Sequence, residues 1–385
     1  MRRIAILGST GSIGKNAAEV IRNLPQEFKV VALSTNSDIE ALYLQIKEFR
    51  PQFACVRDKT AASVLESRLH SRNIRILRGD DGLEEMIKQA ALDKVLLAIS
   101  GAAALMPLIA SVKKGIDIAL ANKEALVMAG PFIINEAKRN NVLLIPVDSE
   151  QSAIWQCLRG EDKKRIKKVY LTASGGPLRT MPKKDFSRIT VKEVLKHPRW
   201  KMGDKITVDS ASLMNKGLEV LETMILFGIS ADKIKVLIHP ESVIHSMVEF
   251  IDGTILAQLS RTDMRIPIQY ALTYPVRLGA NGGSVDFFKL KALHFEEPDF
   301  NKFPCLELAY RAAHDMGSAP CVLNAADEIA VEGFLQKRIQ FSAIPKVIGK
   351  VLKKHRLVRS PSLKEILQAD AWAREEARSL IEGMN

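Results

Sequence analysis

The sequence is poor in cysteine and has no paired cysteine motif. Its 385 residues include four cysteines, Cys55, Cys157, Cys305 and Cys321, which stand far apart without a CxxC pair. Structural zinc sites use CxxC-like spacings, and disulfide frameworks belong to short secreted chains dense in cysteine, so the sequence indicates neither. A reducing cytosol is the compartment that fits best.

Long hydrophobic runs are also missing. The apolar run near the amino terminus covers only Ile4 to Leu7 before Gly8, which is too short for the apolar region of a signal peptide. No uninterrupted apolar stretch approaches the roughly 18 residues that a membrane span needs. We therefore expect a cytoplasmic protein that has no membrane partner.

The composition is otherwise that of a globular protein, with a strong excess of positive charge. The chain is 47% hydrophobic and 26% charged, with a formal net charge of +12. This charge favours acidic partners, either small phosphorylated molecules or a nucleic acid. The basic runs at 163–165, 167–168 and 353–356 lack interleaved aromatic residues. We interpret them as solvated faces and expect no nucleic-acid partner.

From residue 1 to about 148, short β-branched runs alternate with amphipathic helical segments. This alternation predicts an α/β fold with a Rossmann-like, doubly wound parallel sheet in an NADPH-binding domain at 1–148. The expected strands are Ile4 to Leu7, Lys29 to Leu33, Phe53 to Val56, Ile74 to Leu77, Lys94 to Ile99, Ile116 to Leu120 and Val142 to Val147.

The pattern changes after residue 148. An α+β catalytic and connective domain is expected at 149–273, followed by a linker at 274–304 and a C-terminal helical bundle at 305–385. Within the middle domain we expect a short strand before Val208, a long helix from Ala211 to Phe227, and a hairpin turn at Asp252-Gly253.

A glycine-rich loop follows the first expected strand and opens a helix. It reads Gly8-Ser9-Thr10-Gly11-Ser12-Ile13-Gly14, a GxxGxxG spacing in place of the usual GxGxxG. Backbone N–H groups at such a helix start can hold a pyrophosphate, although a tight turn that needs glycine is the alternative. The strand-loop-helix context favours dinucleotide binding.

The end of the second strand favours NADPH over NADH. NAD sites usually place a carboxylate there for the ribose 2′-hydroxyl, but this sequence has Ser34, Thr35, Asn36 and Ser37. Hydroxyl and amide groups tolerate a 2′-phosphate, although the turn contains no Arg or Lys to pair with it. Asp38 is interpreted as the N-cap of the helix beginning near Ile39.

Carboxylates follow the strand Val142 to Val147, at the edge where open α/β sheets bind ligands. If the backbone stays extended, Asp148 and Glu150 point to the same side and can share a cation. The alternative is that Asp148 or Ser149 only caps a helix starting near Ser152.

A second polar group combines an amide, an ammonium and a carboxylate at helical spacing. Asn215, Lys216 and Glu219 share one face of the expected helix, for which a solvated surface is the alternative. An all-oxygen set of carboxylates suits Mg²⁺ or Mn²⁺, with Co²⁺ as a further candidate, and Lys216 would then serve a phosphate. His239 and His245 are interpreted as core or turn histidines.

Further strings complete a resemblance. They are Ala121-Asn122-Lys123-Glu124-Ala125-Leu126, Ala173-Ser174-Gly175-Gly176-Pro177, His197-Pro198-Arg199-Trp200-Lys201-Met202-Gly203 and Asn324-Ala325-Ala326-Asp327-Glu328. With the loop and carboxylates above, the chain resembles the 1-deoxy-D-xylulose-5-phosphate reductoisomerase family over nearly its whole length. The resemblance implies an NADP-dependent oxidoreductase and isomerase of non-mevalonate isoprenoid biosynthesis. Its product would be the terpenoid precursor 2-C-methyl-D-erythritol 4-phosphate.

The resemblance also implies residue roles. The metal ligands would be Asp148, Glu150 and Glu219. Catalytic residues would be Lys123, Glu150, His197 and Trp200. Substrate contacts would be Lys123, Ser149, Glu150, His197 and Glu219, with Ser174, Ser210, Asn215 and Lys216 around the phosphate. Cofactor contacts would be Gly8, Thr10, Gly11, Ser12, Ile13, Asn122, Glu124, the turn Ser34 to Ser37, and Gly203 near the nicotinamide.

A flap and a dimer are implied in the same way. Residues 197–203 would form the flap, with Trp200 over the substrate and Met202 beside it. A homodimer would form through the middle-domain sheet. The alternatives from the residues alone are another NADP-dependent dehydrogenase, acting on an amino-acid semialdehyde or a hydroxy acid, and a basic nucleic-acid-binding protein.

Overall fold

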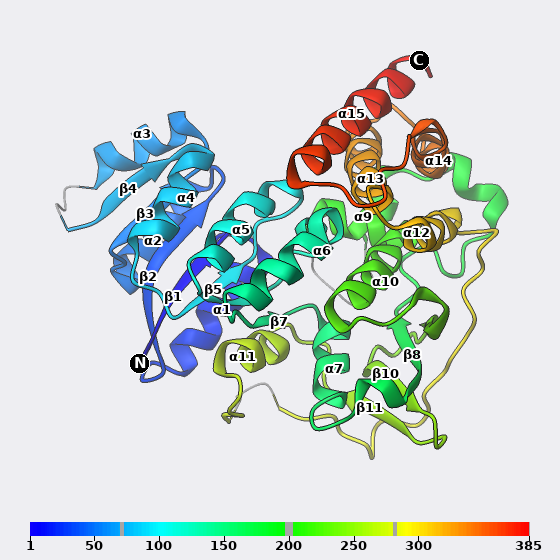
Figure 1. Ribbon diagram of the computed structural model, residues 1–385, viewed down its shortest axis with the longest axis horizontal. Helices are drawn as coiled ribbons and strands as arrows, with labels where there is room; N and C mark the ends of the chain where they lie inside the picture. The colour runs from blue at the N-terminus through cyan, green and yellow to red at the C-terminus, as the bar shows by residue number, and fades with distance from the viewer. Residues whose placement is uncertain (70–72, 197–202, 280–282, 385) are drawn as a thin grey trace. The chain divides into compact units, whose positions relative to one another are not determined.

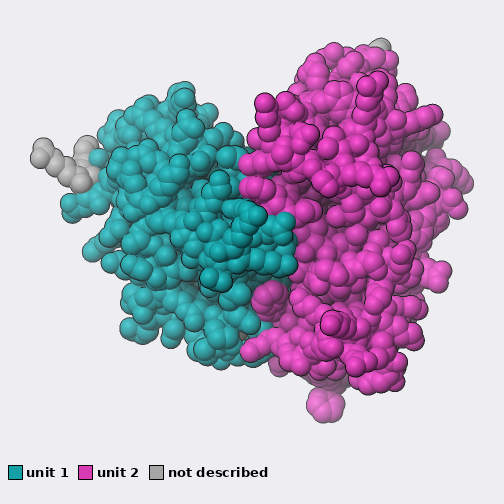
Figure 2. All heavy atoms as spheres, in the orientation of Figure 1, with its two compact units in different colours: residues 1–125, 133–152, 263–283 teal, residues 126–132, 153–262, 284–385 magenta. Residues whose placement is uncertain are grey.

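The computed structural model describes residues 1–69, 73–196, 203–279 and 283–384. The chain forms two compact units, coloured separately in Figure 2. Unit 1 contains residues 1–125, 133–152 and 263–283, and unit 2 contains residues 126–132, 153–262 and 284–385. The helices that follow the linker therefore group with the middle sheet.

Unit 1 is built on a seven-stranded sheet in the order β4-β3-β2-β1-β5-β6-β7 (Figure 1). Each neighbouring pair runs parallel. The strands are β1 (Arg2–Leu7), β2 (Phe28–Thr35), β3 (Phe53–Val56), β4 (Arg75–Arg78), β5 (Lys94–Leu97), β6 (Asp117–Leu120) and β7 (Leu144–Pro146). The central strands are apolar on both faces and buried, as a sheet covered by helices requires. The predicted doubly wound fold is confirmed.

The helices of this unit follow the strands as expected for βαβ units. They are α1 (Ser12–Asn23), α2 (Ile39–Phe49), α3 (Lys59–Arg68), α4 (Gly79–Gln89), a 3-10 turn at Ala102–Ala104, α5 (Leu105–Lys113) and most of α6 (Glu124–Arg139). Asp38 caps α2, because its carboxylate accepts a hydrogen bond from the Ala41 N–H at 3.1 Å. The predicted N-cap is confirmed.

Helix α11 (Arg265–Thr273) also belongs to unit 1, and two cations hold its carboxyl end. The Arg2 guanidinium donates to the Leu272 carbonyl at 2.8 Å, and the Lys94 ammonium donates to the Ala271 carbonyl at 2.8 Å. Positive charge at this end satisfies free carbonyls and complements the helix dipole. Burial lowers the pKa of Lys94 to about 8.

Unit 2 contains a four-stranded mixed sheet in the order β11-β10-β8-β9. Its strands are β8 (Ile166–Ala173), β9 (Ile234–Ile238), β10 (Ile244–Phe250) and β11 (Ile255–Leu259). Strands β10 and β11 pair antiparallel around the expected turn, where Gly253 has a φ of +86°. This conformation favours glycine, and the predicted hairpin is confirmed.

Helices surround one core in unit 2. They are α7 (Ser149–Cys157, which begins in unit 1), α8 (Val191–Val194), α9 (Asp204–Ser212), α10 (Met214–Phe227), α12 (Pro304–Asp315), α13 (Ala319–Leu335), α14 (Ile344–Lys354) and α15 (Leu363–Glu382), with 3-10 turns at Lys163–Arg165, Lys183–Arg188, Ala231–Lys233 and Phe341–Ala343. The inner face of the sheet, including Val169, Leu171 and Val248, shares its buried cluster with α10, α12 and α13. The expected C-terminal helices are confirmed.

Three local expectations differ from the structure. Residues 205–208 form part of helix α9 and not a strand, and Ser149 and Glu150 already belong to helix α7. The β-branched run Ile206-Thr207-Val208 favours a strand by propensity, but burial of Val208 and Ala211 on one helical face overrides it. The long helix expected from Ala211 breaks at Leu213, which has a φ of +59°.

No helix among the described residues is both long and apolar enough to cross a membrane.

All four cysteines are free thiols and buried. Burial raises the pKa of Cys55 to about 12 and that of Cys157 to about 11, so both stay protonated near neutral pH.

Candidate active site

The glycine loop after β1 is a tight cradle that admits no added side chain at two positions. Gly8 has a φ of +87°, and a Cβ there would lie 2.5 Å from the Ala98 carbonyl oxygen. A Cβ on Gly14 would lie 2.4 Å from the Gly8 carbonyl oxygen. Helix α1 begins directly afterwards with Gly11 as its N-cap, so N–H groups of the first turn point out of the loop. This geometry suits a dinucleotide pyrophosphate.

Residues at the end of β2 hold the glycine loop in place through side-chain hydrogen bonds. The Ser34 hydroxyl accepts a hydrogen bond from the Gly8 N–H at 3.0 Å, and the hydroxyls of Thr10 and Thr35 lie 2.6 Å apart. Ser34 and Thr35 are buried, whereas Asn36 and Ser37 are exposed. Within the predicted 2′-phosphate turn, the first two residues hold the loop and the last two face solvent.

Asn122 joins the loops that follow β5 and β6. Its side-chain amide donates to the carbonyls of Ile99 at 2.8 Å and Gly101 at 3.0 Å and to the Glu124 carboxylate at 2.9 Å. Its side-chain oxygen accepts from the Ala125 N–H at 2.8 Å, which caps helix α6. Asn122 and Glu124 thus fix the sheet edge next to the glycine loop, because parallel strands end on one edge.

The carboxylates after β7 stand on this same edge. Asp148 forms an ion pair with Lys123, which is buried at the start of α6. The Ser149 hydroxyl donates to the Glu150 carboxylate at 2.5 Å. Asp148 precedes helix α7, and its carbonyl accepts the Ser152 N–H at 2.8 Å. Of the two alternatives for this segment, an extended backbone or a helix start, the structure has the helix start, which lies at Ser149 and not near Ser152.

Unit 2 carries a separate group of small polar residues at the carboxyl end of β8. The Ser174 hydroxyl accepts from the Gly176 N–H at 3.2 Å. Gly176 has a φ of +68°, and a Cβ there would lie 2.5 Å from the Ser210 carbonyl oxygen. The Ser174 loop therefore lies directly against helix α9 at Ser210, and glycine is required for the close approach.

The first turn of α10 carries the amide, the ammonium and the carboxylate predicted to share a face. Asn215 and Lys216 both donate to the Glu219 carboxylate at 2.6 Å. Lys216 is 3% exposed and Glu219 is fully buried. Lys216 and Glu219 therefore do not lie on a solvated helix face. An ammonium group close to the amino terminus of a helix is suited to binding an anion.

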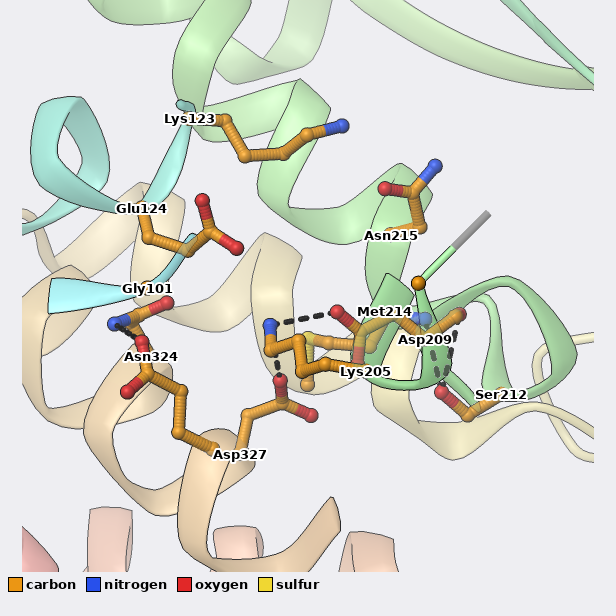
Figure 3. A network of polar contacts seen from close by, with 12 residues as sticks. Gly101, Lys123, Glu124, Lys205, Asp209, Ser212, Met214, Asn215, Asn324 and Asp327 are labelled. Atoms are coloured by element: carbon orange, nitrogen blue, oxygen red, sulfur yellow. Dashed lines mark hydrogen bonds and ion pairs between the residues drawn. The ribbon is translucent and has the colours of Figure 1, made fainter. Parts of the chain in front are cut away.

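A buried network that sequence reasoning missed ties α9 to α13 (Figure 3). The Lys205 ammonium lies 2.6 Å from the Asp209 carboxylate and 3.0 Å from that of Asp327. Both carboxylates are buried. The i,i+4 spacing of Lys205 and Asp209 was the available signal, but it does not reveal the partner on α13. The network fixes the helix on which Ser210 stands.

Replacing Asp327 by Asn is expected to relieve a loss of stability at higher pH. Burial raises the pKa of Asp327 above its usual 3.8, so the stability it contributes is present below that value and is lost as pH rises through the folded-state pKa. Asparagine is neutral throughout. Urea unfolding should therefore show that the stability of Asp327→Asn relative to the wild type increases as pH rises above 3.8, and a pH-independent difference would contradict the raised pKa.

The histidines discounted as ligands are core residues. His239 is fully buried, its Nδ1 lies 3.0 Å from the His294 carbonyl, and its Nε2 accepts from the Val243 N–H at 3.2 Å. His245 is buried as well. The interpretation as core histidines is confirmed.

The predicted flap falls mainly outside the described residues. His197, Trp200 and Met202 are not among them, whereas Gly203 is the N-cap of α9. The Gly203 carbonyl accepts the Thr207 hydroxyl at 2.8 Å. The carboxyl end of the predicted flap is thus attached to the helix that carries Ser210.

A glycine loop at the centre of a doubly wound parallel sheet, with carboxylates along the same edge, defines the class of dinucleotide-dependent oxidoreductases. The chain belongs to the 1-deoxy-D-xylulose 5-phosphate reductoisomerase family. The family model of that name matches residues 4–130. Two further models, both described as C-terminal domains of this reductoisomerase, match residues 144–227 and 259–376.

Relatives cover the chain from end to end. The 1-deoxy-D-xylulose 5-phosphate reductoisomerase of Endomicrobium trichonymphae is 49% identical over 99% of both chains. That of Thermodesulfovibrio yellowstonii is 50% identical over 99% of this chain and 100% of its own. The reductoisomerase of Zymomonas mobilis, solved with NADPH, is 38% identical with a TM-score of 0.92 over 99% of both chains. A reductoisomerase solved with NADPH, fosmidomycin and magnesium has 38% identity and a TM-score of 0.93, covering 99% of this chain and 98% of its own.

The predicted family and enzyme class are confirmed by these matches. An unrelated semialdehyde or hydroxy-acid dehydrogenase and a nucleic-acid-binding protein are set aside as principal functions. NADPH and magnesium, the expected ligands, are present in the solved relatives.

Proposed function

We propose that this chain rearranges 1-deoxy-D-xylulose 5-phosphate and reduces the product to 2-C-methyl-D-erythritol 4-phosphate with NADPH, in non-mevalonate isoprenoid synthesis. One observation carries the proposal. This member of the family has both the glycine loop of unit 1 and the buried site at Lys216 in unit 2. The first suits a dinucleotide and the second a phosphorylated sugar.

We propose that a divalent cation, Mg²⁺, Mn²⁺ or Co²⁺, is held by Asp148, Glu150 and Glu219. The donor chemistry fits, because carboxylate oxygens are the ligands that hard cations prefer. Two of the three carboxylates form ion pairs with ammonium groups, Asp148 with Lys123 and Glu219 with Lys216. Ionised carboxylates form such pairs, and the same ionised form can balance the charge of a cation. When bound, the cation supplies a Lewis acid that polarises the ketone oxygen and stabilises developing negative charge.

The other residues bind and orient the substrate. Ser174, Ser210, Asn215 and Lys216 are proposed to bind the phosphate, since neutral donors and an ammonium are groups that bind phosphate and all four residues belong to unit 2. Lys123, Ser149 and Glu150 are proposed to contact the reacting part of the sugar, with Glu150 moving protons. His197 and Trp200 are proposed to close over the substrate and to exclude water during hydride transfer.

The cofactor is proposed to lie along the carboxyl edge of the seven-stranded sheet. Its pyrophosphate would lie against the loop and the first helical turn, with contacts at Gly8, Thr10, Gly11, Ser12 and Ile13. Asn122 and Glu124 would border the nicotinamide half, with Gly203 as a further contact. The exposed end of the 34–37 turn would face the adenosine 2′-phosphate.

Replacing Lys216 by Ala is expected to raise KM for the phosphorylated substrate by about tenfold to a hundredfold, with a smaller change in kcat. The reason is the loss of a charged hydrogen bond to the phosphate, which is worth about 1.5–3 kcal/mol. Steady-state kinetics at saturating NADPH measure both constants, and KM for NADPH serves as the internal control. An unchanged KM for the sugar phosphate would move the phosphate site elsewhere.

We also propose a homodimer formed through the sheet of unit 2. Strand β11 lies at the edge of this sheet, and it is apolar yet exposed, with Ile255 50% and Leu256 36% accessible. Ile251, just before the turn, is 58% accessible. Exposed apolar edge strands invite pairing with another chain, and a second copy covers them symmetrically.

The dimer is tested by Ile255→Glu, with light scattering after size exclusion as the measurement. A charge in an apolar interface should shift the protein toward monomers at low micromolar concentration. Leu44→Glu is the matched control, because Leu44 is 66% exposed on α2 in unit 1. A monomeric wild type, or an Ile255→Glu variant that stays dimeric, would contradict this interface.

A cytoplasmic site of action is proposed, since the four free thiols suit a reducing compartment. The activity itself is tested by following NADPH oxidation with 1-deoxy-D-xylulose 5-phosphate, with and without Mg²⁺ or Mn²⁺. Metal-dependent oxidation supports substrate, cofactor and cation together. Folded protein that binds NADPH but shows no oxidation with either metal would refute the substrate assignment.

A further inference from the structure

The turn proposed to face the adenosine 2′-phosphate contains no cation of its own. Its exposed residues, Asn36 and Ser37, are neutral. A phosphate monoester carries about −1.5 to −2 charges near neutral pH, so neutral donors alone leave most of this charge uncompensated. A cation from another segment would supply the missing interaction.

Arg57 brings a guanidinium to this turn from the neighbouring strand. It is the first residue after β3, which pairs in parallel with β2. The Arg57 N–H donates to the Thr35 carbonyl at 3.1 Å, and the next N–H, of Asp58, donates to the Asn36 carbonyl at 2.9 Å. These bonds fix residue 57 beside the turn, at the carboxyl edge where the glycine loop also lies.

The guanidinium itself points to the turn. Its Nη1 lies 3.4 Å from the Asn36 side-chain oxygen, while Nε and Nη2 donate to Asp80 at 2.6 and 3.3 Å. A guanidinium has five N–H donors, so three contacts leave two without an acceptor among the described residues. One belongs to Nη1 and one to Nη2, the two terminal nitrogens through which a guanidinium can bind a phosphate in bidentate fashion.

The ion pair with Asp80 leaves the Arg57 guanidinium able to bind a phosphate. Asp80 is mostly exposed, with 69% of its side chain accessible against 28% for Arg57. Exposed pairs are worth little in water, so the pair orients the guanidinium without neutralising it for a dianion.

We propose that Arg57 is a specificity-determining residue that binds the 2′-phosphate of NADPH together with Asn36. This inference rests on the proposed use of NADPH and names a residue outside the glycine loop and its turn. Arg57 discriminates NADPH from NADH, and it makes no contribution to the hydride transfer itself.

The test is calorimetric binding of adenosine 2′,5′-bisphosphate and of adenosine 5′-monophosphate to full-length wild-type and variant protein. Arg57→Met should weaken the bisphosphate by about tenfold to a hundredfold, the range for loss of a charged hydrogen bond, and should change the monophosphate less than about twofold. Arg57→Lys keeps the positive charge but not the planar, bidentate arrangement of donors, and it should keep part of the affinity for the bisphosphate.

Arg75→Met is the matched control, because it removes the same charge at the other end of the neighbouring strand. Arg75 begins β4 opposite Phe53, whereas Arg57 follows the end of β3, and Arg75 pairs with Glu85 at 2.7 Å. This variant should bind both probes as the wild type does. Circular dichroism should show all variants folded, since each loses only an exposed ion pair.

The outcomes are separable. If Arg57→Met weakens both probes equally or neither, the role assigned to Arg57 is wrong while the NADPH assignment stands. If the wild type binds both probes equally, the chain does not recognise a 2′-phosphate, and both proposals fail. A fall in the ratio of kcat/KM for NADPH to that for NADH in Arg57→Met, with kcat at saturating NADPH unchanged, would support the proposal kinetically.

Discussion

Replacing Glu219 by Gln is expected to lower kcat by at least about a thousandfold. The substitution keeps the shape of the side chain and an oxygen acceptor for Asn215, but it removes the charge of a proposed cation ligand. A Lewis acid contributes several kcal/mol of transition-state stabilisation, and each 1.4 kcal/mol corresponds to a factor of ten in rate. Steady-state turnover of 1-deoxy-D-xylulose 5-phosphate over a Mg²⁺ titration measures the effect.

Folding is the necessary control for this variant. Glu219 is also the partner of Lys216, and breaking a buried ion pair costs about 3–5 kcal/mol of stability. Unchanged NADPH affinity and circular dichroism would show that lost activity is not lost structure. Glu222→Gln is the matched variant, one turn further along α10 and 1% exposed. It should retain turnover, and near-normal turnover of Glu219→Gln would refute the metal assignment.

Replacing Gly8 by Ala is expected to abolish measurable NADPH binding and to destabilise unit 1. The new Cβ would lie 2.5 Å from the Ala98 carbonyl oxygen, a backbone atom that cannot move away as a side chain could. The left-handed conformation adds about 1–2 kcal/mol for any residue other than glycine. Since Gly8 follows β1 and Ala98 follows the neighbouring strand β5, relief of the clash requires the glycine loop to move away from the end of β5. Fluorescence titration with NADPH and urea unfolding measure the two effects.

Gly160→Ala separates the clash from the backbone conformation. Gly160 has a φ of +84°, close to that of Gly8, but a Cβ there meets nothing within 4 Å. The variant should therefore lose only the conformational part, about 1–2 kcal/mol, and should bind NADPH normally. If Gly8→Ala and Gly160→Ala lost equal amounts of stability and of NADPH affinity, the contact with Ala98 would make no contribution to the effect of Gly8→Ala.

The sequence by itself determined the fold class of unit 1 and supplied the residue types of the proposed site. Alternating β-branched runs and helical segments fix a parallel doubly wound sheet, because period-2 and period-3.6 patterns bury different faces. The positions of Gly8 to Gly14 and of Asp148 to Glu150 follow, since parallel strands end on one edge. Helical spacing alone brought Asn215, Lys216 and Glu219 onto one face.

Local propensity failed where tertiary packing outweighed it. Ile206, Thr207 and Val208 form a helix because α9 buries one of its faces. Residues 149–150 lie in α7 because β7 ends at Pro146 and the Asp148 carbonyl accepts a hydrogen bond from the Ser152 N–H in the first helical turn. In α9 the strand propensity of residues 206–208 is outweighed by the burial of Val208 and Ala211.

The tertiary structure alone decided which distant residues meet. Asp327 lies beside Lys205 because α13 packs on α9, and Arg57 lies beside Asn36 because β3 pairs with β2 in one particular register. Neither pairing has a sequence period, since the partners come from different elements. The sequence supplied the residue types, and packing of those elements supplied the distances on which charge interactions depend.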